Sequence, residues 1–209
     1  MGSGDWVVAG LGNPGTRYLK TRHNAGFLFI DRLLDTVSPG LRWRSQFKSE
    51  MSAIKFKDQD LLLLKPQTFM NLSGEAVQEC LSFRKMTPEQ LIVVHDEIDI
   101  PFGEIRVKKG GGSAGHNGLK SITERLSSPD YYRIRLGIGR PQGQADSLSG
   151  AVSPQTDVST HVLAPFTAAE SLTLDDMLEL ALKVFEALLS PGLTAAQKAC
   201  NLRKSTTIK

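Results

Sequence analysis

The sequence predicts a single three-layer α/β/α domain built on a twisted, mixed and mostly parallel sheet. Short apolar runs alternate along the chain with segments whose apolar residues recur at helical spacing, and no repeat or interdomain linker interrupts them. A chain of 209 residues is long enough for one sizeable α/β domain and barely long enough for two. We therefore expect one domain over residues 5–204, a cloning remnant at 1–4 and a flexible tail at 205–209.

The first part of the chain should supply four elements of this domain. Residues 6–11 (WVVAGL) are a short apolar run that ends in a Gly-Asn-Pro-Gly turn, which indicates a buried strand. Residues 24–37 carry apolar side chains at helical spacing and precede a Ser-Pro-Gly stop, so they predict a helix. Two strands are expected next, near residues 52–56 and 61–64.

A second helix and the clearest strand follow. Asn71 or Ser73 is expected to cap a helix that runs to about residue 83, with its apolar side chains on one face. Residues 87–90 combine capping-box chemistry with a proline at the first helical position, which predicts a short turn. The run at 91–95 (LIVVH) is typical of a fully buried strand.

The rest of the chain should supply five further elements and a loop. The elements are an edge strand at 104–108, a helix at about 118–126, a strand at 133–138, an amphipathic helix at 167–189 and a last helix at roughly 194–203. Residues 142–155 are rich in glycine and serine, which indicates a mobile loop.

The composition argues against a disordered chain and against a membrane-spanning one. Hydrophobic residues make up 40% and charged residues 22%, as in ordinary globular proteins. No apolar run approaches the ~18 residues that a membrane helix needs, and we expect no signal peptide before Trp6. Cys80 and Cys200 lie far apart and build no disulfide framework, which favours a reducing cytosol. We therefore expect a cytoplasmic protein that does not bind membranes.

Basic residues are concentrated in one part of the chain, although the net charge is only +3. Residues 103–140 hold eight Lys or Arg against three acids, a local charge of +5, whereas acids gather between residues 170 and 186. A polyanionic partner such as a nucleic acid would bind a segregated basic face of this kind. On composition alone, a solvated charged surface is the better interpretation.

Five polar clusters follow the predicted strands or occupy glycine-rich loops. They are residues 12–15 (GNPG), 21–26 (TRHNAG), 69–74 (FMNLSG), 95–97 (HDE) and 115–118 (GHNG). Ligands of open α/β sheets bind beyond the carboxyl ends of the strands, so we expect these clusters to converge there. They combine a histidine without a metal-binding pattern, an acid after a buried strand, and three asparagines. A histidine oriented by a carboxylate is a general base for water, and amides can donate to an oxyanion, which suits hydrolysis of an activated ester.

These clusters also carry a family resemblance. The chain resembles bacterial-type peptidyl-tRNA hydrolase from about residue 6 to residue 203, with its motifs in the family's order. The matching motifs are residues 10–15 (GLGNPG), 21–26 (TRHNAG), 65–74 (KPQTFMNLSG), 95–103 (HDEIDIPFG), 110–120 (GGGSAGHNGLK) and 133–141 (RIRLGIGRP). The resemblance implies a monomeric esterase with no metal, no cofactor and no obligate protein partner. Such an enzyme cuts the ester between a peptide and the 3′-terminal ribose of tRNA, which recycles tRNA from aborted translation.

The resemblance implies catalytic roles for several residues. His23 matches the catalytic base, and Asp96 matches the carboxylate that orients it. Asn13, Asn71 and Asn117 match the asparagines that position the peptide, the water and the oxyanion. In the implied mechanism, neutral His23 takes a proton from water, which then attacks the ester carbonyl.

Other residues are implied to bind the peptide part of the substrate. Met70 should line the peptide channel, and Tyr18, Gly115 and His116 are expected to contact the substrate as well. For His116, the residues themselves leave two interpretations equally open: a second active-site group or a loop residue. His95, at the end of a buried strand, is expected to be packed rather than catalytic.

A third group is implied to bind tRNA. Arg106 and Lys108 match a basic pair that clamps the 5′-phosphate of tRNA, and Lys120 and Arg135 are weaker candidates for the same partner. The chain departs from some relatives at residues 113–114, where Ser-Ala stands in place of His-Gly. We expect this difference to change the mobility of the loop and to leave the chemistry intact.

Two alternatives to a histidine-dependent hydrolase arise from glycine-rich motifs. Residues 10–15 fit a dinucleotide-binding fingerprint, but Pro14 is awkward where the helix should open, and no acid ends a second strand about 20 residues on. Ser113 lies in a serine-elbow pattern with Asp157 and His161 downstream, which would suit a serine esterase. The triple glycine before Ser113 indicates a loose loop instead of a strained elbow.

The remaining alternative is an RNA-binding protein on the same fold that has lost catalysis. His23, Asp96 and the three asparagines argue against it, because a protein that only binds RNA has no need for all five.

Overall fold

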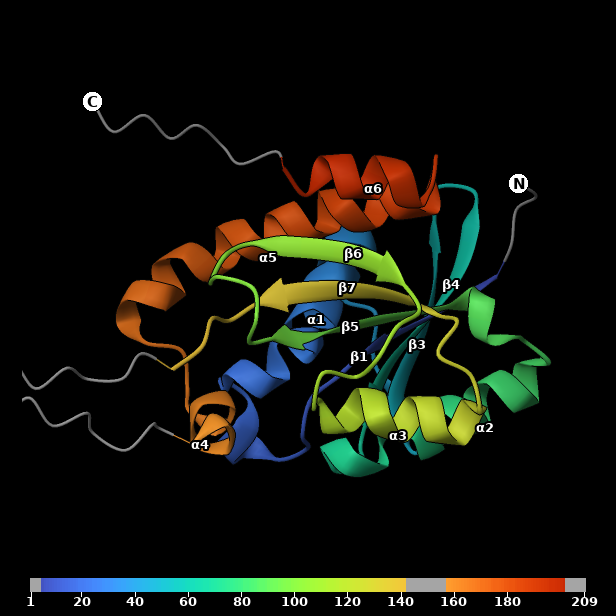
Figure 1. Cartoon of the computed structure of the whole chain (residues 1–209). Helices are drawn as coiled ribbons and strands as arrows, with labels where there is room; N and C mark the ends of the chain where they lie inside the picture. The colour runs from blue at the N-terminus through green and yellow to red at the C-terminus, as the bar shows by residue number, and fades with distance from the viewer. Residues whose placement is uncertain (1–4, 142–156, 202–209) are drawn as a thin grey trace, which may run out of the picture.

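The computed structural model, which describes residues 5–141 and 157–201, contains a seven-stranded sheet of order β2-β3-β4-β1-β5-β7-β6 (Figure 1). The strands are β1 (Trp6–Gly10), β2 (Arg44–Gln46), β3 (Ser49–Phe56), β4 (Gln59–Pro66), β5 (Leu91–Glu97), β6 (Ile105–Lys109) and β7 (Tyr132–Gly137). The expected remnant at 1–4, the loop at 142–155 and the tail at 205–209 lie outside the described residues.

The central strands of this sheet are parallel. β1 pairs with β4 and with β5, and β5 pairs with β7, all in parallel register; Val8, for example, pairs with Leu63 on one side and Ile92 on the other. β3 and β6 run antiparallel to their neighbours, and β2 runs antiparallel to β3. Five of the seven strands therefore point the same way, which confirms the predicted mixed, mostly parallel sheet. β6 lies at the edge, as predicted.

Helices cover both faces of the sheet and complete the predicted three layers (Figure 1). The helices are α1 (Ala25–Val37), α2 (Ser73–Arg84), α3 (Asn117–Leu126), α4 (Val158–Leu163), α5 (Ala168–Leu189) and α6 (Leu193–Ala199). One hydrophobic core joins the sheet to α1, α5 and α6, with Phe29 and Phe185 fully buried in it. A second core joins the sheet to α2 and α3 through residues such as Val77 and Ile122. Within the two described ranges, no helix is both long enough and apolar enough to span a bilayer.

The first turn of α1 lies directly against the carboxyl ends of β1 and β5. A Cβ atom at Gly26 would come within 2.3 Å of the backbone nitrogen of Leu11 and 2.4 Å of the carbonyl oxygen of Val94. A Cβ at Gly10 would meet the carbonyl oxygen of Gly26 at 2.3 Å. Only glycine allows this approach. It fixes the 3₁₀ turn η2 (Arg22–Asn24), which precedes α1, at the edge where these strands end.

Several local predictions can be compared with these elements. The capping box of η4 (Pro88–Gln90) is confirmed. The prediction that Asn71 or Ser73 caps α2 is wrong: Leu72 is the N-cap residue and makes no side-chain cap, while the Ser73 hydroxyl donates to the carbonyl oxygen of Met70 over 2.9 Å. β2 and α4 were not predicted, and α6 ends at Ala199, earlier than expected.

Candidate active site

A cavity of about 840 Å³ opens at the carboxyl ends of the central strands. Its lining brings together most of the residues that the sequence singled out. These are Asn13, His23, Met70, Asn71, Asp96, Gly115, His116 and Asn117. They come from the loop after β1, from η2 and η3 (Met70–Leu72), from the end of β5 and from the start of α3 with the loop before it. The predicted convergence of the polar clusters is therefore confirmed.

His23 and Asp96 form the central contact of this cavity. The Nδ1–H of His23 donates to the carboxylate of Asp96 and lies 3.0 Å from each of its oxygens. Asp96 is 2% exposed and His23 is 9% exposed, so the pair is largely shielded from solvent. A proton held on Nδ1 leaves Nε2 of His23 unprotonated. This is the tautomer that a general base requires.

His116 donates to the same carboxylate from the other side. Its Nε2 lies 3.0 Å from Oδ1 of Asp96, while its Nδ1 accepts hydrogen bonds from the backbone amides of Gly118 and Leu119 at 3.1 and 3.4 Å. An Nδ1 that accepts from amides carries no proton, so the proton of the neutral ring is on Nε2. His116 is thus both the N-cap of α3 and a partner of Asp96. His116 thus lines the cavity and contacts Asp96, while its part in the reaction stays a prediction.

The two imidazoles keep Asp96 ionised. Burial by itself would raise the pKa of this carboxyl group, but His23 and His116 outweigh burial and hold the pKa of Asp96 well below its usual range. His95 shows the opposite effect of burial. It is completely buried, and burial together with His116 lowers the pKa of His95 well below 6.5, so that it stays neutral. Its Nδ1–H donates to the carbonyl oxygen of Asp96 over 2.7 Å, as suits the expected packed histidine.

His23, Asp96 and His116 also meet a distance criterion for a metal site, since their ligand atoms lie within 4.8 Å of one another. The hydrogen bonds at His116 argue against that interpretation. To present an Nε2 lone pair to a metal, the neutral ring would have to carry its proton on Nδ1, against two backbone N–H groups. The arrangement therefore suits a hydrogen-bonded acid–base set better than a metal centre.

The three predicted asparagines differ in how they are held. Asn24 fixes Asn13 by accepting from its backbone N–H at 2.9 Å and donating to its carbonyl oxygen at 3.0 Å. The side-chain oxygen of Asn13 accepts from the backbone N–H of Met70 at 2.8 Å, which leaves the Nδ2 amide of Asn13 for a ligand. Asn71 and Asn117 are exposed, and neither side chain bonds to another described residue. They are available to a ligand but less firmly oriented than Asn13.

An apolar wall, which the sequence analysis missed, forms one side of the cavity. α4 contributes Val158, Val162 and Leu163 to the lining, which also includes Phe69 and Ile98. Phe69, Val158 and Leu163 are between 41% and 54% exposed, so together they offer apolar surface to a ligand in the cavity. The spacing of Val158 and Val162, four residues apart, was the one signal of this wall in the sequence.

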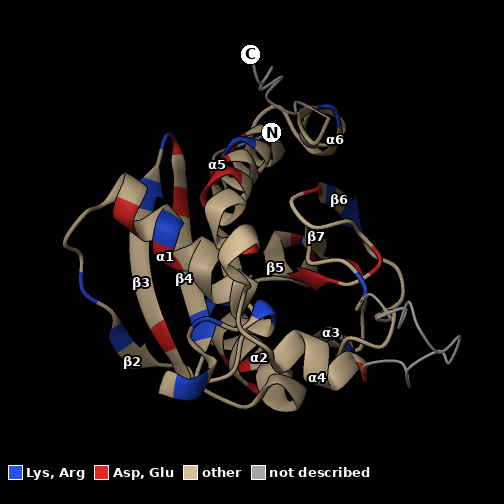
Figure 2. Cartoon of the chain, turned by 90° about the vertical axis from the view of Figure 1, so that its left-hand side faces the viewer, with Lys and Arg blue, Asp and Glu red and all other residues tan. Residues whose placement is uncertain are grey.

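The predicted tRNA-binding residues lie mainly on β6 and β7 (Figure 2). Arg106 is the cross-strand partner of Arg135, so the two share a face of the sheet, and Lys108 shares that face two residues along. Arg135 donates to Glu97 over 3.0 Å, and Glu97 lines the cavity, which joins this basic face to the site. Partial burial and two neighbouring arginines lower the pKa of Lys108.

Two other predicted residues stand apart from these groups. Lys120 is exposed on α3, where its Nζ lies 4.0 Å from Glu124. Tyr18 lies in η1 (Thr16–Tyr18), with the guanidinium of Arg17 over its ring, and is not part of the cavity lining. The role of Tyr18 in substrate binding stays a prediction.

The serine-elbow alternative finds no support in the contacts. Arg133, which is fully buried, donates to the carbonyl oxygens of Gly111 and Gly112 at 2.6 and 2.7 Å, so the loop before Ser113 is anchored and not loose as expected. His161 donates to the carbonyl oxygen of Gly139 at 2.9 Å. Within the described residues, no hydrogen bond joins the side chain of Ser113 to His161 or to Asp157.

The dinucleotide-binding alternative fails on the same kind of evidence. A Cβ at Gly12 would lie 2.7 Å from the ring of Phe27, so this glycine is required by the packing of α1. The element after Gly15 is the three-residue turn η1, whereas the fingerprint asks for a helix whose first turn faces a pyrophosphate. Internal packing explains Gly10 and Gly12, and a positive φ of 104° explains Gly15.

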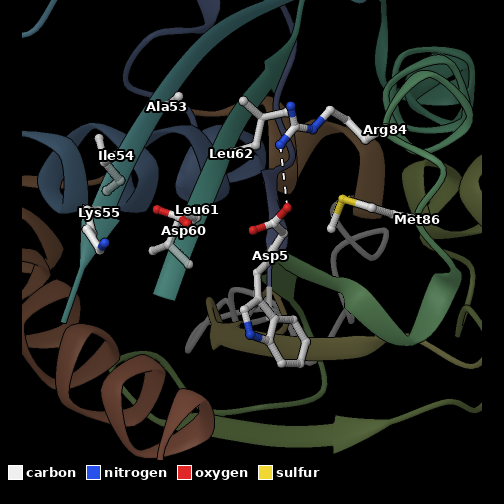
Figure 3. A pocket seen from close by; sticks show the side chains of 10 residues that line it. Asp5, Ala53, Ile54, Lys55, Asp60, Leu61, Leu62, Arg84 and Met86 are labelled. Carbon is white, nitrogen blue, oxygen red and sulfur yellow. Dashed lines mark ion pairs between the residues drawn. The ribbon is translucent and has the colours of Figure 1, made fainter. Parts of the chain in front are cut away.

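A second cavity, of about 380 Å³, lies near the start of β1 (Figure 3). Asp5 and Arg84 form an ion pair of 3.6 Å at its rim, and its other lining residues include Lys55 and Met86. No histidine lines it, and none of the predicted site residues contributes to it. It therefore offers no general base comparable with His23.

Comparison with known proteins supports the same assignment. Residues 7–208 match the family model described as peptidyl-tRNA hydrolase. The peptidyl-tRNA hydrolase of Trichlorobacter lovleyi is 47% identical over 195 residues, which cover 93% of this chain and 94% of the relative. That of Bdellovibrio bacteriovorus is 42% identical over 197 residues, covering 94% and 99%. A crystal structure of peptidyl-tRNA hydrolase from Acinetobacter baumannii matches with a TM-score of 0.82 at 34% identity and covers 94% of each chain.

These similarities extend over nearly the whole chain and agree in sequence and in fold. They confirm the resemblance on which the site residues were chosen, and they identify an enzyme that releases peptides from peptidyl-tRNA. The chain belongs to the peptidyl-tRNA hydrolase family.

Proposed function

We propose that this enzyme hydrolyses its ester substrate through a water molecule activated by His23. The observation that carries the proposal is the contact between His23 and the buried carboxylate of Asp96, which keeps the proton on Nδ1 and frees Nε2. Nε2 removes a proton from water as the water oxygen bonds to the ester carbonyl carbon. The tetrahedral intermediate then collapses, the bond to the ribose 3′-oxygen breaks, and imidazolium His23 returns the proton to that oxygen. The products are the free peptide and tRNA.

The asparagines are proposed to hold the reacting groups. The Nδ2 amide of Asn13, fixed by Asn24 and Met70, is a suitable donor to the peptide backbone next to the ester. Asn71 and Asn117 line the cavity, and we assign to them the orientation of the water and the donation to the oxyanion. One oxyanion donor is typically worth about 2.7–4 kcal/mol of transition-state stabilisation.

The basic face is proposed to bind the tRNA. Arg106, Lys108 and Arg135 lie together on β6 and β7, where phosphate contacts would position the acceptor end over the cavity. We place the reaction in the cytoplasm, where peptidyl-tRNA arises from translation, and we expect the enzyme to act as a monomer. Its role there would be to recycle tRNA from aborted translation.

The test is release of N-acetyl-amino acid from N-acetyl-aminoacyl-tRNA in the presence of a chelator. Wild-type enzyme should turn over, and His23→Asn should lose about 10³-fold or more in kcat while binding tRNA normally. Tight tRNA binding without turnover by the wild type would favour the RNA-binding alternative. A variant with nearly full activity would remove His23 from the role of base.

A further inference from the structure

Arg22, the residue before His23, holds α4 in place. Its Nε and Nη2 donate to the two carboxylate oxygens of Glu170 at 3.1 and 2.6 Å. Its Nη1 donates to the carbonyl oxygens of His161 and Ala164 at 3.3 Å each, and its backbone N–H donates to the same oxygen of Ala164 at 3.1 Å. The side chain thus spans the last turn of α4 and the first turn of α5 from the turn that carries His23.

The segment that Arg22 anchors is the apolar wall of the cavity. Val158, Val162 and Leu163 of α4 line the cavity that contains His23. Figure 1 shows α4 beside the N-terminal segment that leads into α1. Two backbone contacts reinforce the attachment: Thr21 forms a bridge with Pro165, and the N–H of Phe166 donates to the carbonyl oxygen of Lys20 at 3.1 Å. The position of the wall is therefore set relative to residues 20–22.

The surroundings of Arg22 make this anchor specific for arginine. The residue is 6% exposed, and its guanidinium satisfies a bidentate carboxylate and two carbonyl oxygens at once. A lysine amine has no planar fork and reaches fewer of these acceptors in fixed geometry. Burial alone would raise the pKa of Glu170, but hydrogen bonds from Arg22 and Thr167 outweigh it and lower this pKa, so the pair remains ionic.

We propose that Arg22 is a positioning residue that sets the distance between His23 and the apolar wall of α4, and so determines how tightly the enzyme binds the amino acid next to the ester. This inference rests on the proposed function, since it assumes that His23 marks the position of the ester. The partner of the wall is the side chain of that amino acid, and a large apolar side chain gains most from the contact. Arg22 itself touches neither the water nor the ester.

The experiment compares two substrates, N-acetyl-phenylalanyl-tRNA and N-acetyl-glycyl-tRNA, on wild type and Arg22→Met. The variant should raise KM for the phenylalanyl substrate about tenfold, the change expected when part of an apolar contact is lost, and KM for the glycyl substrate by less than about twofold. The kcat for both substrates should stay close to that of the wild type, and so should the fall of kcat at acidic pH. Arg22→Lys should recover part of the lost preference.

The matched control is Arg32→Met. Arg32 on α1 also pairs with acids of α5, namely Asp175 and Glu179, but among the described residues no hydrogen bond or ion pair joins its side chain to α4. Its replacement should leave the preference between the two substrates unchanged. If Arg22→Met does not fold, Glu170→Gln tests the same anchor from the other end, because glutamine keeps the capping chemistry of α5 and removes the carboxylate charge.

The outcomes separate the two proposals. Equal losses on both substrates, or no change in KM, would overturn the positioning role while wild-type turnover upholds the proposed function. Failure of the wild type to hydrolyse either substrate would instead remove the proposed function and this inference with it.

Discussion

His116 donates to Oδ1 of Asp96 over 3.0 Å, and the same oxygen lies 3.0 Å from Nδ1 of His23. One carboxylate therefore accepts hydrogen bonds from two imidazoles, and each of these hydrogen bonds weakens the other. The stability of the folded protein should report this sharing, because both imidazoles stabilise the charge on Asp96 and lower its pKa.

His116→Asn should lower the free energy of unfolding, and by less when Asp96 is also replaced. Asparagine can still accept from the amides of Gly118 and Leu119 as an N-cap, but it is too short to replace the donor to Asp96. Asp96 would then lose one of the two imidazoles that lower its pKa, so its buried charge would be less stabilised. Urea titrations of His116→Asn, Asp96→Asn and the double variant would give the coupling energy between the two residues, and additive losses would show that His116 does not stabilise the charge on Asp96.

Asp96→Asn should keep the fold and lose most of the activity. An amide in place of the carboxylate can donate to Nδ1 of His23, which moves the ring proton to Nε2 and removes the base. In a serine protease the corresponding change costs about 10⁴-fold in kcat, and we expect a loss of about 10³- to 10⁴-fold here. Single-turnover hydrolysis would give the rate, with tRNA binding as the control for folding. A loss below tenfold would mean that Asp96 does not select the tautomer.

Arg106→Gln and Lys108→Gln should weaken tRNA binding and its dependence on salt. Each variant removes one phosphate partner, so the slope of log K against log salt should fall by about one. Lys55→Gln is the control, because Lys55 is an exposed cation on β3, which lies near the opposite edge of the sheet from β6. Filter binding at several salt concentrations gives the slopes. Equal slopes for wild type and both variants would exclude these residues from the tRNA contact.

His95→Gln should make stability less sensitive to acid. The folded protein keeps His95 neutral, whereas the unfolded chain protonates it below its ordinary pKa of 6.5. In that range the unfolded state binds a proton that the folded state does not, so the free energy of unfolding falls as pH falls, by up to ~1.4 kcal/mol per pH unit from this one group. Urea titrations between pH 6.5 and 5 should show a shallower fall for the variant. Parallel curves would contradict the assignment of this effect to His95.

Much of the fold followed from local sequence patterns. Residues 91–95 predicted β5 correctly, because a run of large apolar residues is typical of a strand that is buried on both faces. β2 was not predicted, because its three residues, Arg44–Gln46, are all exposed and show no alternation of apolar and polar side chains. α4 was not predicted, because its six residues make less than two helical turns, too few for a helical spacing of apolar residues to be recognised.

The site was predicted as a set of residues but not as a geometry. The motifs placed His23 and Asp96 beside the ends of predicted strands, and the parallel topology brings those ends to one edge of the sheet. Nothing in the sequence indicated that His116 would share the carboxylate of Asp96, since this depends on where α3 begins relative to β5. The ion pair of Arg22 with Glu170 depends on packing between residues 148 positions apart, and no local pattern encodes it.

The turn at residues 22–24 has a consequence for folding kinetics. Asn24 contacts a residue 11 positions away, His23 one 73 positions away and Arg22 one 148 positions away. Contacts of such large sequence separation form late, because each requires closure of a long loop of chain. A chain still lacking its last third cannot complete this turn. The attachment of α4 through Arg22 should therefore form last, after the segment up to Glu170 has left the ribosome, so the apolar wall joins a site whose His23–Asp96 contact does not depend on that segment.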